Sequence, residues 1–233
     1  TDELQKRIQA TAAFAADVAH EIKNPLSSLR SATESFSRAK TAAQKKQLLN
    51  VILQDVQRLD RLITDISQAS RVDTEIIGQD RDPVDFAGLI DNFIQMRSQT
   101  HSQYQLRYEH PPLPVMVRMN ESRMVQVIDN VLSNAISFSP KGGMVQFILT
   151  ADAIRKHVAL EILDDGPGIP DAKLETVFDR FYTERPSGES FGEHSGLGLS
   201  IARQIVDAHN GQLTAENRPE GGACFRLVLP LES

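Results

Sequence analysis

The feature that most constrains the fold is the spacing of apolar residues in the first third of the chain. Between residues 44 and 72 they recur at intervals of 4, 4, 3, 4 and 3, at Leu48, Ile52, Val56, Leu59, Ile63 and Ile66. This alternation is typical of the seam of a packed helical hairpin or coiled coil. A second helical run, at residues 4–39, precedes it across a polar break at 40–44. One hairpin cannot bury both its stripe and its flanks, so we expect two copies to form a four-helix bundle, a homodimer through residues 1–72.

The run at 4–39 carries a histidine on its polar side. On a helical wheel of about 100° per residue, His20 lies roughly 180° from the centre of the apolar stripe, which consists of Phe14, Val18, Ile22, Pro25, Leu26 and Leu29. Since imidazole titrates near neutrality, an accessible one suits a nucleophile that is briefly modified. An ordinary solvated helix surface is the alternative interpretation. Pro25 cannot donate a hydrogen bond to the carbonyl of Glu21, so we expect a kink one turn after His20.

The rest of the chain indicates an α+β domain. After a linker at 76–83, the patterns predict helices at 86–97, 121–138 and 198–208, and strands at 104–108, 115–119, 145–150, 157–163, 212–216 and 223–229. Strands in series, punctuated by single helices, favour a layer of helices on one face of a mixed sheet. The expected domains are therefore residues 1–75 and 84–233.

Composition excludes several classes of function. The net charge of −6 over 233 residues argues against nucleic acid as the main partner. The single cysteine, Cys224, rules out an internal disulfide and a cysteine-based zinc site, and it fits a reducing compartment. No stretch approaches the roughly 18 apolar residues of a membrane span. We expect a soluble segment that is compatible with excision from a larger membrane protein.

Three motifs in the second domain point to a nucleotide. Asn130 and Asn134 are one helical turn apart and suit a cation shared with phosphates. Asp165 begins a Gly-Pro-Gly turn, where a carboxylate can accept a hydrogen bond from the amine of adenine. Residues 195–199 (SGLGL) enter a helix whose free N–H groups attract phosphate, after a polar segment at 183–194 that suits a lid. Taken singly, each motif is also compatible with a solvated face, an ordinary turn or a plain helix entry.

Five motifs stand in order along the chain: AHEIKNPL around His20, the NxxxN helix, DDGPGIP, VFDRFYT and SGLGLSIARQIVDAHNG. Together they resemble the H, N, G1, F and G2 boxes of two-component sensor histidine kinases, over nearly the whole chain. The stretches FAADVAHEIKNPLSSLRSA, RFYTERP and FGEHSGLGLS also resemble the ChvG/BvrS type of alphaproteobacterial envelope sensor kinase. The resemblance implies a dimeric phosphotransfer hairpin followed by a Bergerat-type (GHKL) ATP-binding domain, a two-layer α+β sandwich.

The resemblance also implies roles for individual residues. His20 would be the phosphoacceptor, Glu21 would orient or deprotonate its imidazole, and Asn24 would position water for dephosphorylation of a response regulator. Asn134 would hold Mg²⁺. The residues that would contact ATP are Asn130, Asn134, Asp165, Gly166, Gly168, Ile169, Phe178, Arg180, Phe181, Ser195, Gly196, Leu197, Gly198 and Leu199. Ser137 and Thr183 depart from the family pattern, because basic residues are common at both positions.

The predicted protein is thus the cytoplasmic core of a bacterial inner-membrane sensor histidine kinase that uses ATP and Mg²⁺. Its expected partners are a second copy of itself and the receiver domain of a response regulator. The alternatives are a GHKL-type conformational ATPase, a phosphatase-dominant regulator without significant kinase activity, and a non-enzymatic dimerisation scaffold. An outward His20 favours the kinase over a clamp ATPase, and Asn134, Asp165 and the glycines of the 195–199 motif argue against a scaffold.

Overall fold

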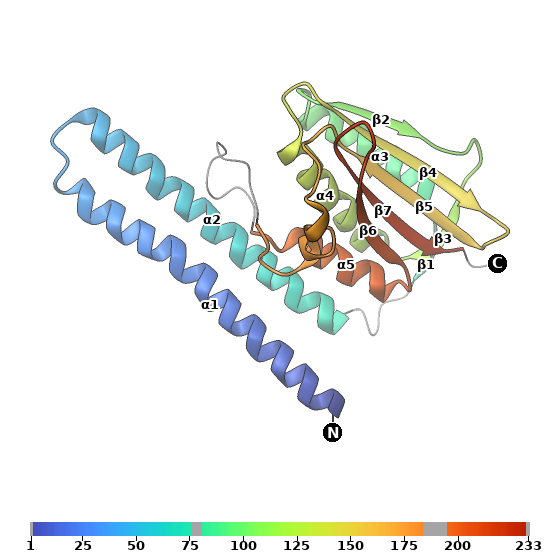
Figure 1. Cartoon of the computed structure of the whole chain (residues 1–233), viewed down its shortest axis with the longest axis horizontal. Helices are drawn as coiled ribbons and strands as arrows, with labels where there is room; N and C mark the ends of the chain where they lie inside the picture. The colour runs from blue at the N-terminus through green and yellow to red at the C-terminus, as the bar shows by residue number, and fades with distance from the viewer. Residues whose placement is uncertain (1, 76–80, 184–194, 232–233) are drawn as a thin grey trace. The chain divides into compact units, whose positions relative to one another are not determined.

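The computed structural model describes residues 2–75, 81–183 and 195–231, apart from the side chains of 2–4, 6–11 and 68–75. The chain separates into two compact units, one around the two N-terminal helices and one around a β-sheet (Figure 1), and each is described by itself. No helix among the described residues is long and apolar enough to span a membrane.

The first unit contains the predicted helical hairpin, which is confirmed. Helix α1 spans Asp2–Phe36 and continues through Pro25, and α2 spans Ala42–Glu75. A capping box fixes the start of α2. The Thr41 hydroxyl accepts from the N–H of Gln44 at 3.2 Å, and the Gln44 side chain accepts from the N–H of Thr41 at 3.3 Å. The turn at 37–41 is therefore set by local sequence.

The two helices pack through a narrower stripe than the sequence predicts. Pro25, Ala32 and Leu62 are buried in this unit, and Leu48, Ile52, Leu59 and Ile66 are half-buried. Val56 and Ile63, predicted on the same seam, are instead 50% and 58% exposed, and Leu26 of α1 is 50% exposed. Val56 and Ile63 continue a second apolar row on α2 that begins at Leu49 and Leu53, which are 47% and 52% exposed. The apolar spacing in the sequence did not distinguish these two adjacent stripes, so it predicted a single one.

The second unit is built on a five-stranded sheet in the order β2-β4-β5-β7-β6. The strands are β2 (Gln105–Glu109), β4 (Met144–Asp152), β5 (His157–Leu163), β6 (Gln212–Asn217) and β7 (Ala223–Pro230). Strand β2 pairs with β4 in parallel, and the other neighbours are antiparallel, so the sheet is mixed as predicted.

Helices α3 (Phe86–Thr100), α4 (Glu121–Phe138) and α5 (Gly198–Ala208) lie on one side of this sheet (Figure 1). Alternate strand residues face them, and this alternation separates a buried face from a more polar one. The buried face includes Val145, Phe147, Leu149, Val158, Leu160, Ile162, Phe225, Leu227 and Leu229. The core therefore lies between the helices and the sheet.

His209, just after α5, links the end of α5 to the start of α4. Its Nε2 accepts a hydrogen bond from the backbone N–H of Asn120, the N-cap of α4, at 3.1 Å. The other nitrogen, Nδ1, therefore carries the proton that is donated to the Ile205 carbonyl at 2.7 Å. Burial lowers the pKa of His209, so the neutral ring is favoured.

A small second sheet pairs β1 (Asp82–Asp85) with β3 (Met116–Met119). The end of the predicted linker, at Asp82 and Pro83, is therefore strand, and the preceding residues 76–80 lie outside the described part of the chain. The 3-10 turns η1 (Asp171–Lys173) and η2 (Thr176–Phe178) follow β5.

Candidate functional site

The predicted phosphoacceptor lies on the solvent side of α1. His20 and Asn24, one turn apart, are both exposed, whereas Glu21 is half-buried and turns toward α2. There the Glu21 Oε2 atom forms an ion pair with Nη2 of Arg58 at 3.1 Å. The exposed imidazole and its inward-facing neighbour match the helical-wheel prediction for His20.

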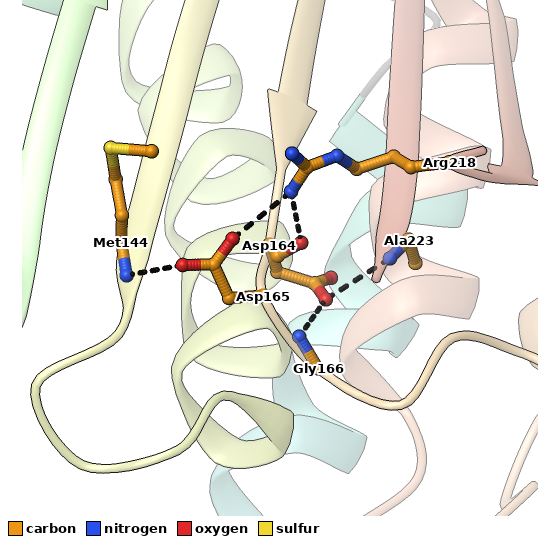
Figure 2. A network of polar contacts seen from close by, with 6 residues as sticks. All are labelled: Met144, Asp164, Asp165, Gly166, Arg218 and Ala223. Atoms are coloured by element: carbon orange, nitrogen blue, oxygen red, sulfur yellow. Dashed lines mark hydrogen bonds and ion pairs between the residues drawn. The ribbon is translucent and has the colours of Figure 1, made fainter. Parts of the chain in front are cut away.

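In the second unit, strand β5 ends in two adjacent carboxylates that face different surroundings (Figure 2). Asp164 is 2% exposed, and its Oδ1 accepts hydrogen bonds from the backbone N–H groups of Gly166 at 2.8 Å and Ala223 at 3.1 Å. Burial raises the pKa of Asp164, and these two hydrogen bonds partly offset the rise. No hydrogen bond among the described residues reaches its second oxygen, Oδ2, which leaves one acceptor for a ligand.

Asp165, the predicted adenine-reading residue, is exposed and already engaged at both oxygens (Figure 2). Oδ2 accepts from the N–H of Met144 at 2.9 Å, and Oδ1 contacts Nη1 of Arg218 at 3.1 Å. The same Arg218 nitrogen also donates to the backbone carbonyl of Asp164. Asp165 thus ties the start of β4 to the turn between β6 and β7.

The glycine turn after these carboxylates is held by Asn217 at the end of β6. The Ile169 N–H donates to Asn217 Oδ1 at 2.7 Å, and Asn217 Nδ2 donates to the Ile169 carbonyl at 2.6 Å. Gly166 and Gly168 lie within this clamped turn, and Gly168 has φ of 80°. The predicted turn residues therefore form one rigid backbone segment beside Asp164.

The predicted asparagines on α4 are half-buried and differ in their contacts. Asn130 donates from Nδ2 to the carbonyl of Gly198 at 2.9 Å, which joins α4 to the first turn of α5, where Leu199 follows. Asn134, one turn further along α4, makes no side-chain hydrogen bond with the residues that the structure describes. Its amide is thus uncommitted within the described part of the chain, one turn after the asparagine that contacts the start of α5.

Phe178 and its neighbours anchor the chain before the predicted lid. Phe178 is 5% exposed and packs edge-on against Phe225, with ring centroids 6.2 Å apart. The guanidinium carbon of Arg203 lies 4.1 Å from the centroid of the Phe178 ring and covers it. Arg180 follows two residues later and is half-buried.

Phe181 and the glycine-containing motif at 195–197 are brought together locally. The Phe181 N–H donates to the Gly196 carbonyl at 2.9 Å, and the Ser195 hydroxyl accepts from the N–H of Leu197 at 3.1 Å. Gly196 has φ of 75°, and a Cβ there would lie 2.8 Å from the Phe181 carbonyl carbon, so only glycine fits. The predicted lid at 183–194 lies, from residue 184 onward, outside the described residues.

Prediction from sequence missed Asp164, Arg218 and Asn217. Strand alternation contains the signal for Asp164, because Val158, Leu160 and Ile162 point into the core and residue 164 continues that face. Nothing near Arg218 or Asn217 in the sequence indicates the site, since both reach it through the pairing of β6 and β7.

The described residues contain no cluster of three or more His, Cys, Asp or Glu side chains that could hold a metal ion. Asn134, with its uncommitted amide oxygen, is suited to contribute one ligand to a hard cation whose other ligands are phosphate and water oxygens.

Two family models match the chain. The His Kinase A (phospho-acceptor) domain, HisKA, matches residues 10–75. The histidine kinase-, DNA gyrase B- and HSP90-like ATPase domain, HATPase_c, matches residues 119–233. Among curated proteins, the sensor protein ChvG of Rhizobium meliloti (strain 1021) is 44% identical over 244 residues, which cover 99% of this chain and 42% of that protein. The chain therefore spans less than half the length of this relative.

Solved structures that are similar to this chain include histidine kinases. A mycobacterial sensor histidine kinase, MprB, is 32% identical with a TM-score of 0.56, over 64% of this chain and 97% of that one. The histidine kinase ThkA, in complex with the response regulator protein TrrA, has a TM-score of 0.76 at 23% identity, over 98% of this chain and 64% of that one. At that identity the second likeness shows the fold alone.

Proposed function

The chain belongs to the sensor histidine kinase family, and from this membership we propose that it transfers the γ-phosphoryl group of ATP to His20 and then to an aspartate of a response regulator. The observation that carries the proposal is the exposure of His20 on α1, within the segment that matches the phospho-acceptor domain. An exposed imidazole can meet both a nucleotide and a partner protein.

The chemistry at His20 needs alignment and charge neutralisation more than covalent assistance. One ring nitrogen forms the new N–P bond while the bond from the γ-phosphorus to the bridging oxygen breaks and ADP leaves. Positive charge develops on the ring, and the Glu21 carboxylate can stabilise it or accept the proton of the other nitrogen. The phosphoramidate then passes its phosphoryl group to a carboxylate oxygen of the regulator.

For ATP we propose that Asp164, rather than the predicted Asp165, accepts the hydrogen bond from the adenine amine. Asp164 has an uncommitted oxygen, whereas both oxygens of Asp165 are engaged by Met144 and Arg218. Asn134, with Asn130 and Gly198 beside it, is assigned to the phosphates, where its amide oxygen would hold Mg²⁺. Bound Mg²⁺ would neutralise phosphate charge.

The second apolar row on α2, at Leu49, Leu53, Val56 and Ile63, supports a homodimer. Four side chains that are each about half-exposed lie on one side of the helix, and a second copy would bury them. The receiver domain of a regulator is the proposed second partner. Reliance on ATP fits the proposed cytoplasmic location, as part of a bacterial inner-membrane protein.

A phosphatase activity toward the same regulator is the second proposed function. Asn24 is exposed one turn beyond His20, where its amide can orient a water molecule against the phosphoryl group of a docked partner. The kinase needs His20 as nucleophile, whereas this reaction needs Asn24.

The test of the kinase is incorporation of label from γ-labelled ATP with Mg²⁺, in the wild type and in His20→Ala. The expected label is acid-labile and base-stable, as a phosphoramidate is, and it is absent from the variant. A wild type that takes up no label, or a variant that keeps it, contradicts the proposal.

A further inference from the structure

An ion pair crosses the hairpin directly beside the phosphoacceptor. Nη2 of Arg58 on α2 lies 3.1 Å from Oε2 of Glu21 on α1, and the two side chains are only 17% and 23% exposed. Partial burial makes such a pair stronger than a surface one, because solvent screens it less. In this arrangement the Glu21 carboxylate is held by Arg58, so it is less available to the His20 imidazole.

A second carboxylate lies one turn before Arg58 on α2. Oδ2 of Asp55 is buried and has no hydrogen-bond partner among the described residues. An unpaired buried oxygen is energetically unfavourable, so a hydrogen-bond donor that moves toward Asp55 would be stabilised there. Residues three apart on a helix are neighbours, which places the Arg58 guanidinium within reach of Asp55. Arg58 therefore has two possible carboxylate partners, Glu21 across the hairpin and Asp55 on its own helix.

Pro25 loosens α1 at the same level. Because proline has no N–H, the Glu21 carbonyl lacks the hydrogen bond that residue 25 would otherwise donate within the helix. Pro25 is buried within the unit that contains both helices, so a change in how that unit packs acts on this turn. The backbone that carries Glu21 is thus less restrained than its neighbours.

We propose that Arg58 is a positioning residue that exchanges between Glu21 and Asp55. When Arg58 pairs with Glu21, as here, the carboxylate is withheld from His20. When Arg58 pairs with Asp55, Glu21 is released to orient the imidazole or accept its proton. The inference rests on the proposed role of His20 and adds a two-state device that sets the rate of its phosphorylation.

The experiment measures the initial rate of His20 labelling in three variants. Arg58→Gln removes the positive charge that holds Glu21, so the rate is expected to rise about tenfold, as when a state populated in about 10% of molecules becomes dominant. The isosteric Asp55→Asn removes the charge of the alternative partner, so the rate is expected to fall. The double variant should behave like Arg58→Gln, since without Arg58 the state of Asp55 no longer matters.

Two controls separate positioning from loss of fold. Arg58→Lys retains the charge and is expected to stay close to the wild-type rate, and Arg61→Gln removes one positive charge from the exposed side of α2 and should change the rate little. Rates of Arg58→Gln and Asp55→Asn that shift in the same direction, or not at all, overturn the exchange. If Arg58→Gln does not fold, the direction of change in Asp55→Asn decides alone. The proposed function fails separately, through an unlabelled wild type.

Discussion

Gly222 offers the sharpest test of how the turn between β6 and β7 supports the nucleotide site. Its φ is +87°, and a Cβ there would overlap the backbone oxygen of Asp164. Gly221 has a similar φ of +101° but nothing within 4 Å of the same position. Gly222→Ala therefore adds a steric clash to backbone strain, whereas Gly221→Ala adds strain alone. The two variants form a matched pair.

The magnitudes follow from these contacts. Strain from a side chain at positive φ is about 1–2 kcal/mol, and a side chain forced into a filled space adds about 1–3 kcal/mol. Gly221→Ala is thus expected to lower the free energy of unfolding by about 1–2 kcal/mol and Gly222→Ala by about 2–5 kcal/mol. At about 2–4 °C per kcal/mol for a domain of this size, the Gly222→Ala melting temperature should fall by roughly 5–20 °C.

The assay is differential scanning calorimetry, which can separate the transitions of the two units. ATP affinity, measured by isothermal titration calorimetry, should also fall in Gly222→Ala, because the displaced carbonyl belongs to the residue whose carboxylate is proposed to read adenine. Equal melting temperatures for the two alanine variants would refute the reasoning, since only the available space distinguishes them.

Three further predictions concern other parts of the molecule. Asp164→Asn keeps the oxygen that accepts from both backbone N–H groups, so it should fold normally yet bind ATP roughly 10- to 100-fold more weakly in titration calorimetry. Asp165→Asn should have a small effect on ATP affinity. If Asp165→Asn weakens ATP binding more than Asp164→Asn does, Asp165 is the residue that reads adenine. Because burial lowers the pKa of His209 below its ordinary 6.5, the unfolded chain binds the proton first as pH falls through that value. Thermal melts should therefore show stability declining from pH 7 toward 5, and a slope unchanged in His209→Gln would count against this cause. Leu62→Ala should lower the free energy of unfolding by about 2–5 kcal/mol, while Ile63→Ala, at a side chain 58% exposed, should instead weaken self-association in sedimentation experiments; a dimer unaffected by Ile63→Ala would remove that residue from the interface.

Periodicity predicted the helices and strands well where local pattern determines them. The predicted helices at 121–138 and 198–208 have the same bounds in α4 and α5, because amphipathic spacing and the glycine at the start of α5 are local signals. Strand β1 was missed, since Asp82 and Pro83 are typical of a linker and become strand only by pairing with β3. Pairing between distant segments leaves little signal in the sequence of either strand.

The candidate site likewise contains residues that the local sequence predicted and others that depend on tertiary burial. The Asn130–Gly198 hydrogen bond joins two residues that the sequence had already selected. The motif predicted Asp165 as the residue that reads adenine, whereas we propose Asp164, which precedes the same glycine. Burial separates them, and burial depends on which side of β5 faces the helices. Likewise, heptad spacing on α2 could not assign Val56 and Ile63 to a second face, since two adjacent stripes share one period.

The parallel pairing of β2 with β4 has a consequence for the order in which the chain folds. Gln105 pairs with Met144, with β3 and α4 between them, so β2 remains an unpaired edge until much more of the chain has been synthesised. Each helix of the hairpin forms instead through hydrogen bonds within one turn, and the start of α2 is set by the local contacts of Thr41 and Gln44. Local contacts form faster than distant ones. The phosphoacceptor helices are therefore expected to form first on the ribosome, and closure of the nucleotide-binding sheet to be the slow, aggregation-sensitive step.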